Sequence, residues 1–250
     1  MNTSQMNKSA AWIGLVMSSA VTKTFVHFYP SAGPVVAPYE VVSTFTLFGE
    51  GVETQTIGIE GARLAQPDGV PVQELFSCLR EPKAGLLGIK VELSSTSSRG
   101  RLDASQCIIE LKSRESSVKY RAKRLLLDDS EQNVKYQNKL FLNLNDKFNT
   151  SSLIAVNASA YSVTTTFADS GRSNAQSSDS EHEEHLQRHE GLAPFAVQEF
   201  NFKEGKDLHD SRWGGVATEV VELQEPHSEF AYFSMYKDVA TNRAVSVSPL

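Results

Sequence analysis

Residues 22–29 have the sequence Thr-Lys-Thr-Phe-Val-His-Phe-Tyr, and this stretch decides the predicted fold class. Side chains alternate between the two faces of a β-strand, and β-branched and aromatic residues favour strands. Apolar side chains occupy both alternating positions here, a pattern that suits a strand close to the core of a β-sandwich. We therefore predict that residues 22–29 form a strand of an antiparallel sandwich.

The same pattern recurs through most of the chain, in stretches bounded by Gly, Pro, Ser, Asn and Asp. We expect further strands at residues 41–48, 54–60, 86–94 and 106–112 in the first half, and at residues 139–144, 152–156, 161–167, 194–202, 215–223 and 229–236 in the second. These stretches predict an all-β protein with an antiparallel β-sandwich architecture.

A change in composition between residues 113 and 139 divides the chain. A basic run ends at Arg124 and is followed by an acidic run at residues 128–131. We place a boundary near residue 130 and predict two tandem sandwich-like units, 1–129 and 130–250, each with one short helix. A single large sandwich or barrel with a long insertion is the alternative, because all-β domains reach this length.

The helix of the first unit is predicted just after Pro71. A proline suits the first turn of a helix, apolar side chains then share one face as far as Leu79, and Pro82 prevents continuation. Cys78 lies beside that face. Cys78 and Cys107 lack the close paired spacing of a zinc ribbon or redox motif, so they either form one bridge or are two buried thiols.

A polar insertion at residues 168–193 interrupts the second unit. Residues 168–180 contain no apolar anchor that would offset the entropy cost of ordering them, so we expect a flexible loop. Residues 181–190 are predicted to form the second short helix. Ser180 and Glu183 have the spacing of a capping box, and Gly191 is placed to end the helix.

Three histidines of this predicted helix, His182, His185 and His189, would share one face. Three neutral imidazoles can hold zinc, copper or nickel and leave a position open for water or substrate. The spacing differs from the His-Glu-x-x-His motif, because His182 and His185 are three residues apart. The alternatives are a solvated helix with no ligand and a pH-sensitive loop.

Charge and composition exclude several classes of protein. The 250 residues carry a net charge of −6, which argues against a protein whose main task is gripping a phosphate backbone. In the basic run at residues 112–124, Val118 and Tyr120 alternate with lysines and arginines. This alternation predicts an edge strand whose cations discourage aggregation. No apolar run approaches the length of a membrane span.

The N-terminal residues have two interpretations. Lys8, the apolar residues 10–17 and the small residues 18–20 outline a signal peptide with cleavage after Ala20. The same residues also fit a buried strand. We expect a cytoplasmic protein, with a secreted or periplasmic one as the alternative if residues 1–20 are removed.

No catalytic constellation is evident in the sequence. Residues 207–211, Asp-Leu-His-Asp-Ser, contain the residue types of a hydrolase triad, but triads are assembled from distant segments. The chain has no Gly-x-Ser-x-Gly elbow and no phosphate-binding glycine loop. We therefore predict a non-catalytic β-sandwich binding protein that needs no cofactor and recognises a protein partner, itself or a small ligand.

Two other functions remain open from the sequence. One is a metal-binding protein or metal-dependent enzyme that uses His182, His185 and His189, with a divalent transition metal as its cofactor. The other is a secreted carbohydrate- or surface-binding module in which Trp12, Trp213 and tyrosines form a stacking surface.

Overall fold

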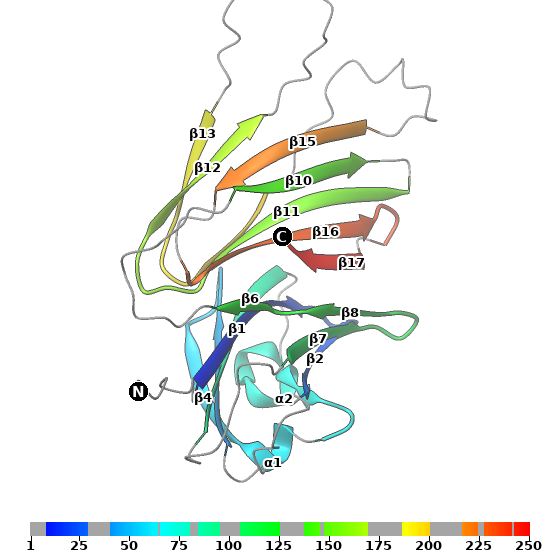
Figure 1. The fold of residues 1–250 in the computed structure, drawn as a ribbon. Coiled ribbons are helices and arrows are strands. Elements are labelled where there is room, and N and C mark those ends of the chain that lie inside the picture. The colour runs from blue at the N-terminus through cyan, green and yellow to red at the C-terminus, as the bar shows by residue number, and fades with distance from the viewer. Residues whose placement is uncertain are drawn as a thin grey trace, which may run out of the picture.

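The computed structural model describes residues 9–29, 41–64, 66–80, 85–95, 106–125, 138–145, 148–169, 187–200, 217–224, 228–241 and 243–250. Most of these residues form β-strands in four antiparallel sheets, which confirms the predicted all-β, sandwich-like fold. Figure 1 shows the sheets stacked as layers, with the second half of the chain above the first.

Two sheets are built from the first half. Sheet A has the order β4-β3-β6-β1-β9 and sheet B the order β5-β2-β7-β8. Their strands are β1 (Ser9–Ser18), β2 (Lys23–Tyr29), β3 (Val41–Phe48), β4 (Gln55–Glu60), β5 (Val70–Pro71), β6 (Gly85–Ser95), β7 (Gln106–Lys112), β8 (Ser117–Arg121) and β9 (Lys123–Leu125). All five strands predicted here are present, with ends that differ by one residue at most.

Short helical turns follow β4 and β5. They are α1 (Gly61–Leu64), α2 (Val72–Leu75) and the 3-10 turn η2 (Ser77–Leu79). Pro71 is the N-cap residue of α2, so the helix begins where the sequence predicted it. It ends after one turn, because the backbone of Phe76 is extended.

The second half forms two four-stranded sheets. Sheet C has the order β10-β15-β12-β13 and sheet D the order β14-β11-β16-β17. Their strands are β10 (Asn138–Asn145), β11 (Asn149–Asn157), β12 (Val163–Asp169), β13 (Gln187–Leu192), β14 (Ala196–Phe200), β15 (Ala217–Gln224), β16 (Phe230–Asp238) and β17 (Ala244–Pro249). Among the strands that the structure describes, none pairs with a strand of the other half; the units 1–129 and 130–250 remain our proposal for the domains.

Sheet D is buried on both faces. Leu153 and Tyr232 pack toward sheet C, whereas Ile154, Phe233 and Met235 belong to a cluster that continues into the first half. Sheet D accordingly lies between sheet C and the first half (Figure 1). This position explains why residues 229–236 are apolar in both alternating positions.

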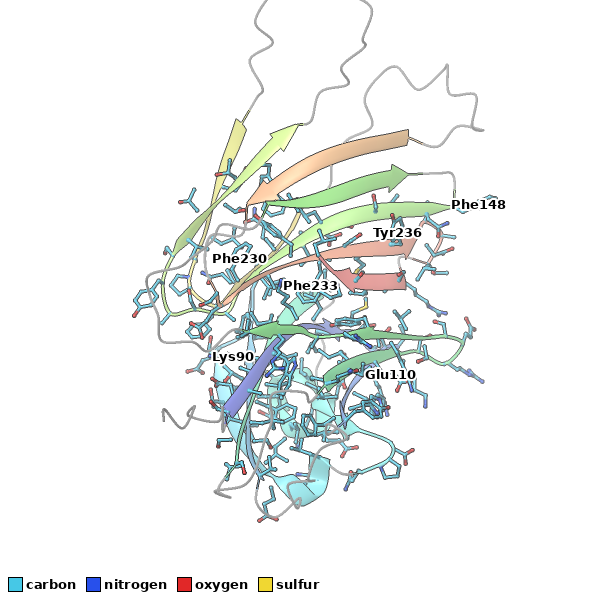
Figure 2. All side chains as sticks on the ribbon, viewed as in Figure 1. Lys90, Glu110, Phe148, Phe230, Phe233 and Tyr236 are labelled. Carbon is cyan, nitrogen blue, oxygen red and sulfur yellow. The ribbon has the colours of Figure 1, made fainter. Side chains whose placement is uncertain are left out.

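Aromatic and ionic contacts join the two halves. Phe233 meets the Tyr120 ring edge to face at 6.0 Å, between sheet D and the first half (Figure 2). Lys90 Nζ lies 2.7 Å from a carboxylate oxygen of Glu229 and 3.0 Å from one of Glu92. Burial alone lowers the pKa of Lys90, but its hydrogen bonds to both carboxylates outweigh burial and raise the pKa. The half-buried lysine therefore stays charged.

The N-terminal residues form a strand. β1 pairs with β6 along its whole length and with β9 over Ala11–Ile13, and most of its side chains are buried. Residues 10–17, the apolar part of the signal-peptide outline, thus belong to the core of the first half. Cleavage after Ala20 would remove a central strand of sheet A.

The predicted helix at 181–190 is wrong where the structure describes it. Residues 187–190 belong to strand β13, which pairs with β12, and residues 170–186 lie outside the described residues. Thr165 and Phe167, on the β-branched and aromatic strand β12, face Glu190 and Arg188 across the ladder. This pairing overrides the local capping and charge signals that predicted a helix. In the described part of the second half we find no helix.

Cys78 and Cys107 are free thiols. Cys107 lies on the inner face of β7, where burial raises its pKa to about 12. Burial also raises the pKa of the half-buried Cys78 thiol. Of the two alternatives for these cysteines, the structure has the separate thiols.

Candidate functional site

The outer face of sheet B carries a group of charged side chains from three neighbouring strands. Strand register fixes its rows: Lys23 lies opposite Lys112, and Phe25 opposite Glu110, which in turn faces Lys119 of β8. We call this surface the basic face and define it by the outward-facing residues of three strands: Lys23, Phe25, His27, Tyr29, Gln106, Ile108, Glu110, Lys112, Ser117, Lys119 and Arg121.

Glu110 is the centre of the basic face. One of its carboxylate oxygens lies 2.7 Å from His27 Nε2 and 3.5 Å from Lys119 Nζ, and the other accepts a hydrogen bond of 2.6 Å from the Ser117 hydroxyl. His27 and Glu110 are both buried. The carboxylate thereby ties β7 to β2 on one side and to β8 on the other.

The pKa of Glu110 is lowered although the group is buried. Burial on its own raises the pKa, but the hydrogen bonds from Ser117 and His27 and the charge of Lys119 outweigh it. Glu110 is therefore ionised at neutral pH. A buried carboxylate is stable only with such partners, so its contacts hold the surrounding side chains in place.

Gly69 lies against the ring of His27. This glycine has φ +76°, a conformation that disfavours L side chains, and an added Cβ would lie 2.8 Å from the His27 ring. The turn that contains Gly69 leads directly into β5, which pairs with β2 at Phe25 and Val26. The tight turn therefore covers His27 and fixes the end of the basic face.

The cations of the basic face point into solvent. Lys23, Lys112, Lys119 and Arg121 are exposed, and we find no ion pair between a described carboxylate and Lys23, Lys112 or Arg121. Lys112 Nζ lies 5.9 Å from the centre of the Phe25 ring, a cation–π contact. Tyr29 is 52% exposed and adds an amphipathic side chain at the end of the face.

The order of the three groups around Glu110 differs from that of a hydrolase triad. In a serine hydrolase the histidine lies between the nucleophile and the carboxylate, so that it can take the hydroxyl proton. Here the carboxylate of Glu110 lies between Ser117 and His27, and the Ser117 hydroxyl donates to the carboxylate. Among the described residues, no group of three or more His, Cys, Asp or Glu side chains could hold a metal ion.

The structure separates the predicted site residues. His189 lies on β13 opposite Thr166, whereas His182 and His185 lie outside the described residues. A helical face shared by all three histidines is therefore absent, because His189 belongs to a strand. A metal site formed in another way stays a prediction.

Other predicted features are placed as follows. The edge strand expected within residues 112–124 is β8, at the end of sheet B, with Lys119 and Arg121 outward as predicted. Trp12 is buried and packs against Phe28, so it offers no sugar-stacking surface. Residues 207–211 and Trp213 lie outside the described residues. Among the described residues, no helix is long and apolar enough to cross a lipid bilayer.

Sequence reasoning missed the contact between His27 and Glu110. The only local signals are a glutamate inside the apolar stretch at residues 107–111 and a histidine inside residues 24–29. Eighty-three positions separate the two residues, and only the register of β2 against β7 brings them together. Comparison with known protein families and with curated proteins finds no match to this chain.

Proposed function

We propose that this chain is a non-catalytic binding protein that recognises an acidic segment of a protein partner on the basic face. The observation that carries the proposal is the register that sets Lys23 directly opposite Lys112. Like charges directly opposite each other on neighbouring strands destabilise a sheet. A carboxylate bound between these two lysines would relieve the repulsion, because it supplies the negative charge that neither lysine has as a partner in the free protein.

The basic face differs in charge from the rest of the chain. A net charge of −6 keeps most of an acidic partner's approach unfavourable, whereas the basic face attracts it locally. Complementary charge of this kind directs both the orientation and the rate of association. The contacts of Glu110 hold the three strands rigid, which reduces the entropy cost of binding.

A protein partner suits the face better than a nucleic acid. Single-stranded nucleic acids bind on successive exposed aromatic rings within a basic groove. Of the three rings that β2 places on this face, His27 is buried and Phe25 is half-buried under Lys112, so Tyr29 alone is well exposed. A single exposed ring therefore favours an acidic peptide segment over a single-stranded nucleic acid.

The test is a binding titration with a fluorescently labelled peptide of alternating glutamate and serine residues. We expect anisotropy to rise with the wild-type protein and salt to weaken binding. Lys23→Gln and Lys112→Gln should each weaken binding by about twofold to fivefold, the value of one exposed ion pair. Lys23→Gln should also stabilise the free protein by about 0.2–1 kcal/mol, because it removes the opposed charge.

Arg63→Gln and Arg80→Gln are the matched controls, since both arginines are exposed and neither lies on sheet B. These variants lose the same charge and should bind the peptide like the wild type. Equal weakening by the control variants would show that net charge alone drives binding and would overturn the proposed site. Tighter binding of a single-stranded oligonucleotide of equal charge would overturn the choice of partner.

A further inference from the structure

We infer that strand β4 is a self-association edge, on which a second copy of this chain adds its own β4 to form one continuous sheet. β4 is the end strand of sheet A and pairs with β3 on one side; among the described residues no strand pairs with its other side. This surface is distinct from the basic face, so the inference is independent of the proposed function.

β4 lacks the features that block pairing at most other edges; among the described end strands, β14 also has no lysine, arginine or proline, but its side chains are half-buried or buried. Natural edge strands carry lysines or prolines or are very short, because an open strand recruits another. β8 presents exposed Lys119 and Arg121, β17 ends at Pro249, and β5 and β9 are only two and three residues long. β4 has six residues, Gln-Thr-Ile-Gly-Ile-Glu, with no lysine, arginine or proline.

The strand is also held in a conformation ready to pair. A hairpin with Gly49 and Gly51 at positive φ joins it to β3. The Ser43 hydroxyl donates a 2.6 Å hydrogen bond to the carbonyl of Ile59, and the hydroxyls of Thr46 and Thr56 lie 3.0 Å apart. Cross-strand contacts of this kind keep β4 extended, so pairing requires little further ordering.

The sequence of β4 is complementary to itself in an antiparallel arrangement. A two-fold axis through Gly58 places Ile57 opposite Ile59 of the second copy, and the reverse, so that each face of one copy continues the same face of the other. Ile57 and Ile59 pack toward the core side of sheet A, and their pairing would extend that apolar layer.

The charges also suit this register. Glu60 falls opposite Thr56 of the second copy, so the two Glu60 carboxylates are not opposed. Gly58 meets its own copy at the axis, where it presents no side chain, and a Cβ built there meets nothing within 4 Å. On the outer surface beside β4, Val42 is 50% exposed and Thr44 is half-buried, and the charged side chains of the next strand, Lys90 and Glu92, pair with each other. A second copy is therefore the occupant that this edge fits.

The first experiment is sedimentation of the full chain over a range of concentrations. We expect a reversible monomer–dimer equilibrium for the wild type and a dissociation constant raised at least several-fold by Gly58→Lys, which opposes two cations at the axis. Gly85→Lys is the matched control, because Gly85 is an exposed strand glycine with the same open space at its Cβ. This variant should dimerise like the wild type.

Cross-linking tests the register without relying on a disruptive variant. In a Cys78→Ser background, oxidised Gly58→Cys should form a covalent dimer. Thr56→Cys should not, because the two Thr56 positions would lie about 13 Å apart, beyond the reach of a disulfide. A chain that stays monomeric at every concentration, equal dissociation by both lysine variants, or cross-linking at residue 56 in place of residue 58 would overturn the inference.

The same variants separate this inference from the proposed function. Monomeric Gly58→Lys should still bind the acidic peptide with wild-type affinity, because the basic face lies on sheet B. Loss of peptide binding in Lys23→Gln, conversely, should leave the dimer intact.

Discussion

Tyr120→Phe removes a single hydroxyl from the place where the first half meets the second. That hydroxyl accepts a hydrogen bond of 2.6 Å from the Leu15 backbone N–H and donates one of 2.9 Å to the Leu15 carbonyl. β9 pairs with β1 only over Ala11–Ile13, so Leu15 lies just beyond its end. The tyrosine hydroxyl therefore gives the Leu15 backbone the hydrogen bonds that a longer β9 would provide.

The expected cost follows from what the substitution leaves behind. Leu15 is fully buried, and burial raises the pKa of Tyr120, so its hydroxyl remains protonated and can serve both backbone groups. Each buried backbone group left without a partner costs about 1–3 kcal/mol. Phenylalanine keeps the ring contact with Phe233. It also removes the cost of desolvating the tyrosine hydroxyl, which offsets part of the loss. We expect a loss of about 2–4 kcal/mol in the free energy of unfolding.

Urea denaturation followed by tryptophan fluorescence measures this loss. The midpoint should fall by about 1 M with little change in slope, since the slope reflects the surface exposed on unfolding. Tyr29→Phe is the control, because this tyrosine is half exposed and its loss should change stability by less than about 0.5 kcal/mol. A Tyr120→Phe midpoint equal to that of the control would refute the role assigned to the hydroxyl.

Four further predictions concern the core, the basic face and the histidines. The pKa of Glu110 is lower in the folded chain, so its ionised carboxylate stabilises the fold above the unfolded pKa of about 4.3, and this stabilisation is lost as pH falls through the folded pKa. The difference in unfolding free energy between wild type and Glu110→Gln should therefore narrow in acid. A difference that stays constant with pH would contradict this. Gly88→Ala should destabilise by about 1–3 kcal/mol in denaturant titrations, because the new methyl meets the Phe48 ring, and a neutral result would refute that contact. Phe233→Ala should cost about 3–5 kcal/mol and lower the thermal midpoint of the whole chain, whereas a second, unshifted transition would show that the halves unfold independently. Elemental analysis of freshly purified, untagged chain should find metal near background, and replacing His182, His185 and His189 by alanine should leave the melting temperature unchanged. Stoichiometric metal would instead support the alternative function as a metal-binding protein.

The alternation of apolar and polar side chains between turn-forming residues is sufficient to predict most of the strands. Residues 41–48 and 106–112 were predicted with the ends that the structure has, because turn-forming residues bound them and their side chains alternate. β8 was predicted as a charged edge for the same reason. The failure at residues 187–190 has a definite cause: a charged segment with helix-capping signals pairs with the β-branched strand β12, and pairing outweighs local preference.

The candidate site could not be predicted in this way. The contact between His27 and Glu110 and the opposition of Lys23 and Lys112 both depend on register, which no local pattern specifies across more than eighty residues. The sequence contained a hint, since a glutamate inside an apolar strand needs partners. It did not say which partners, because several histidines and basic residues could have met it.

The strands that are apolar on both faces determine which surfaces of the sheets stay exposed. In an antiparallel sheet with one solvated face, apolar and polar residues alternate, so a strand apolar on both faces implies a layer on each side. β1 and β16 are of this kind, and Tyr120, whose hydroxyl binds Leu15 of β1, contacts Phe233 of β16 where the two halves meet. The packing of sheet D against the first half covers the inner layers of both halves. The outer face of sheet B and the edge at β4 remain exposed on different sheets, so the two proposed contacts, one with an acidic partner and one with a second copy, do not compete for the same surface.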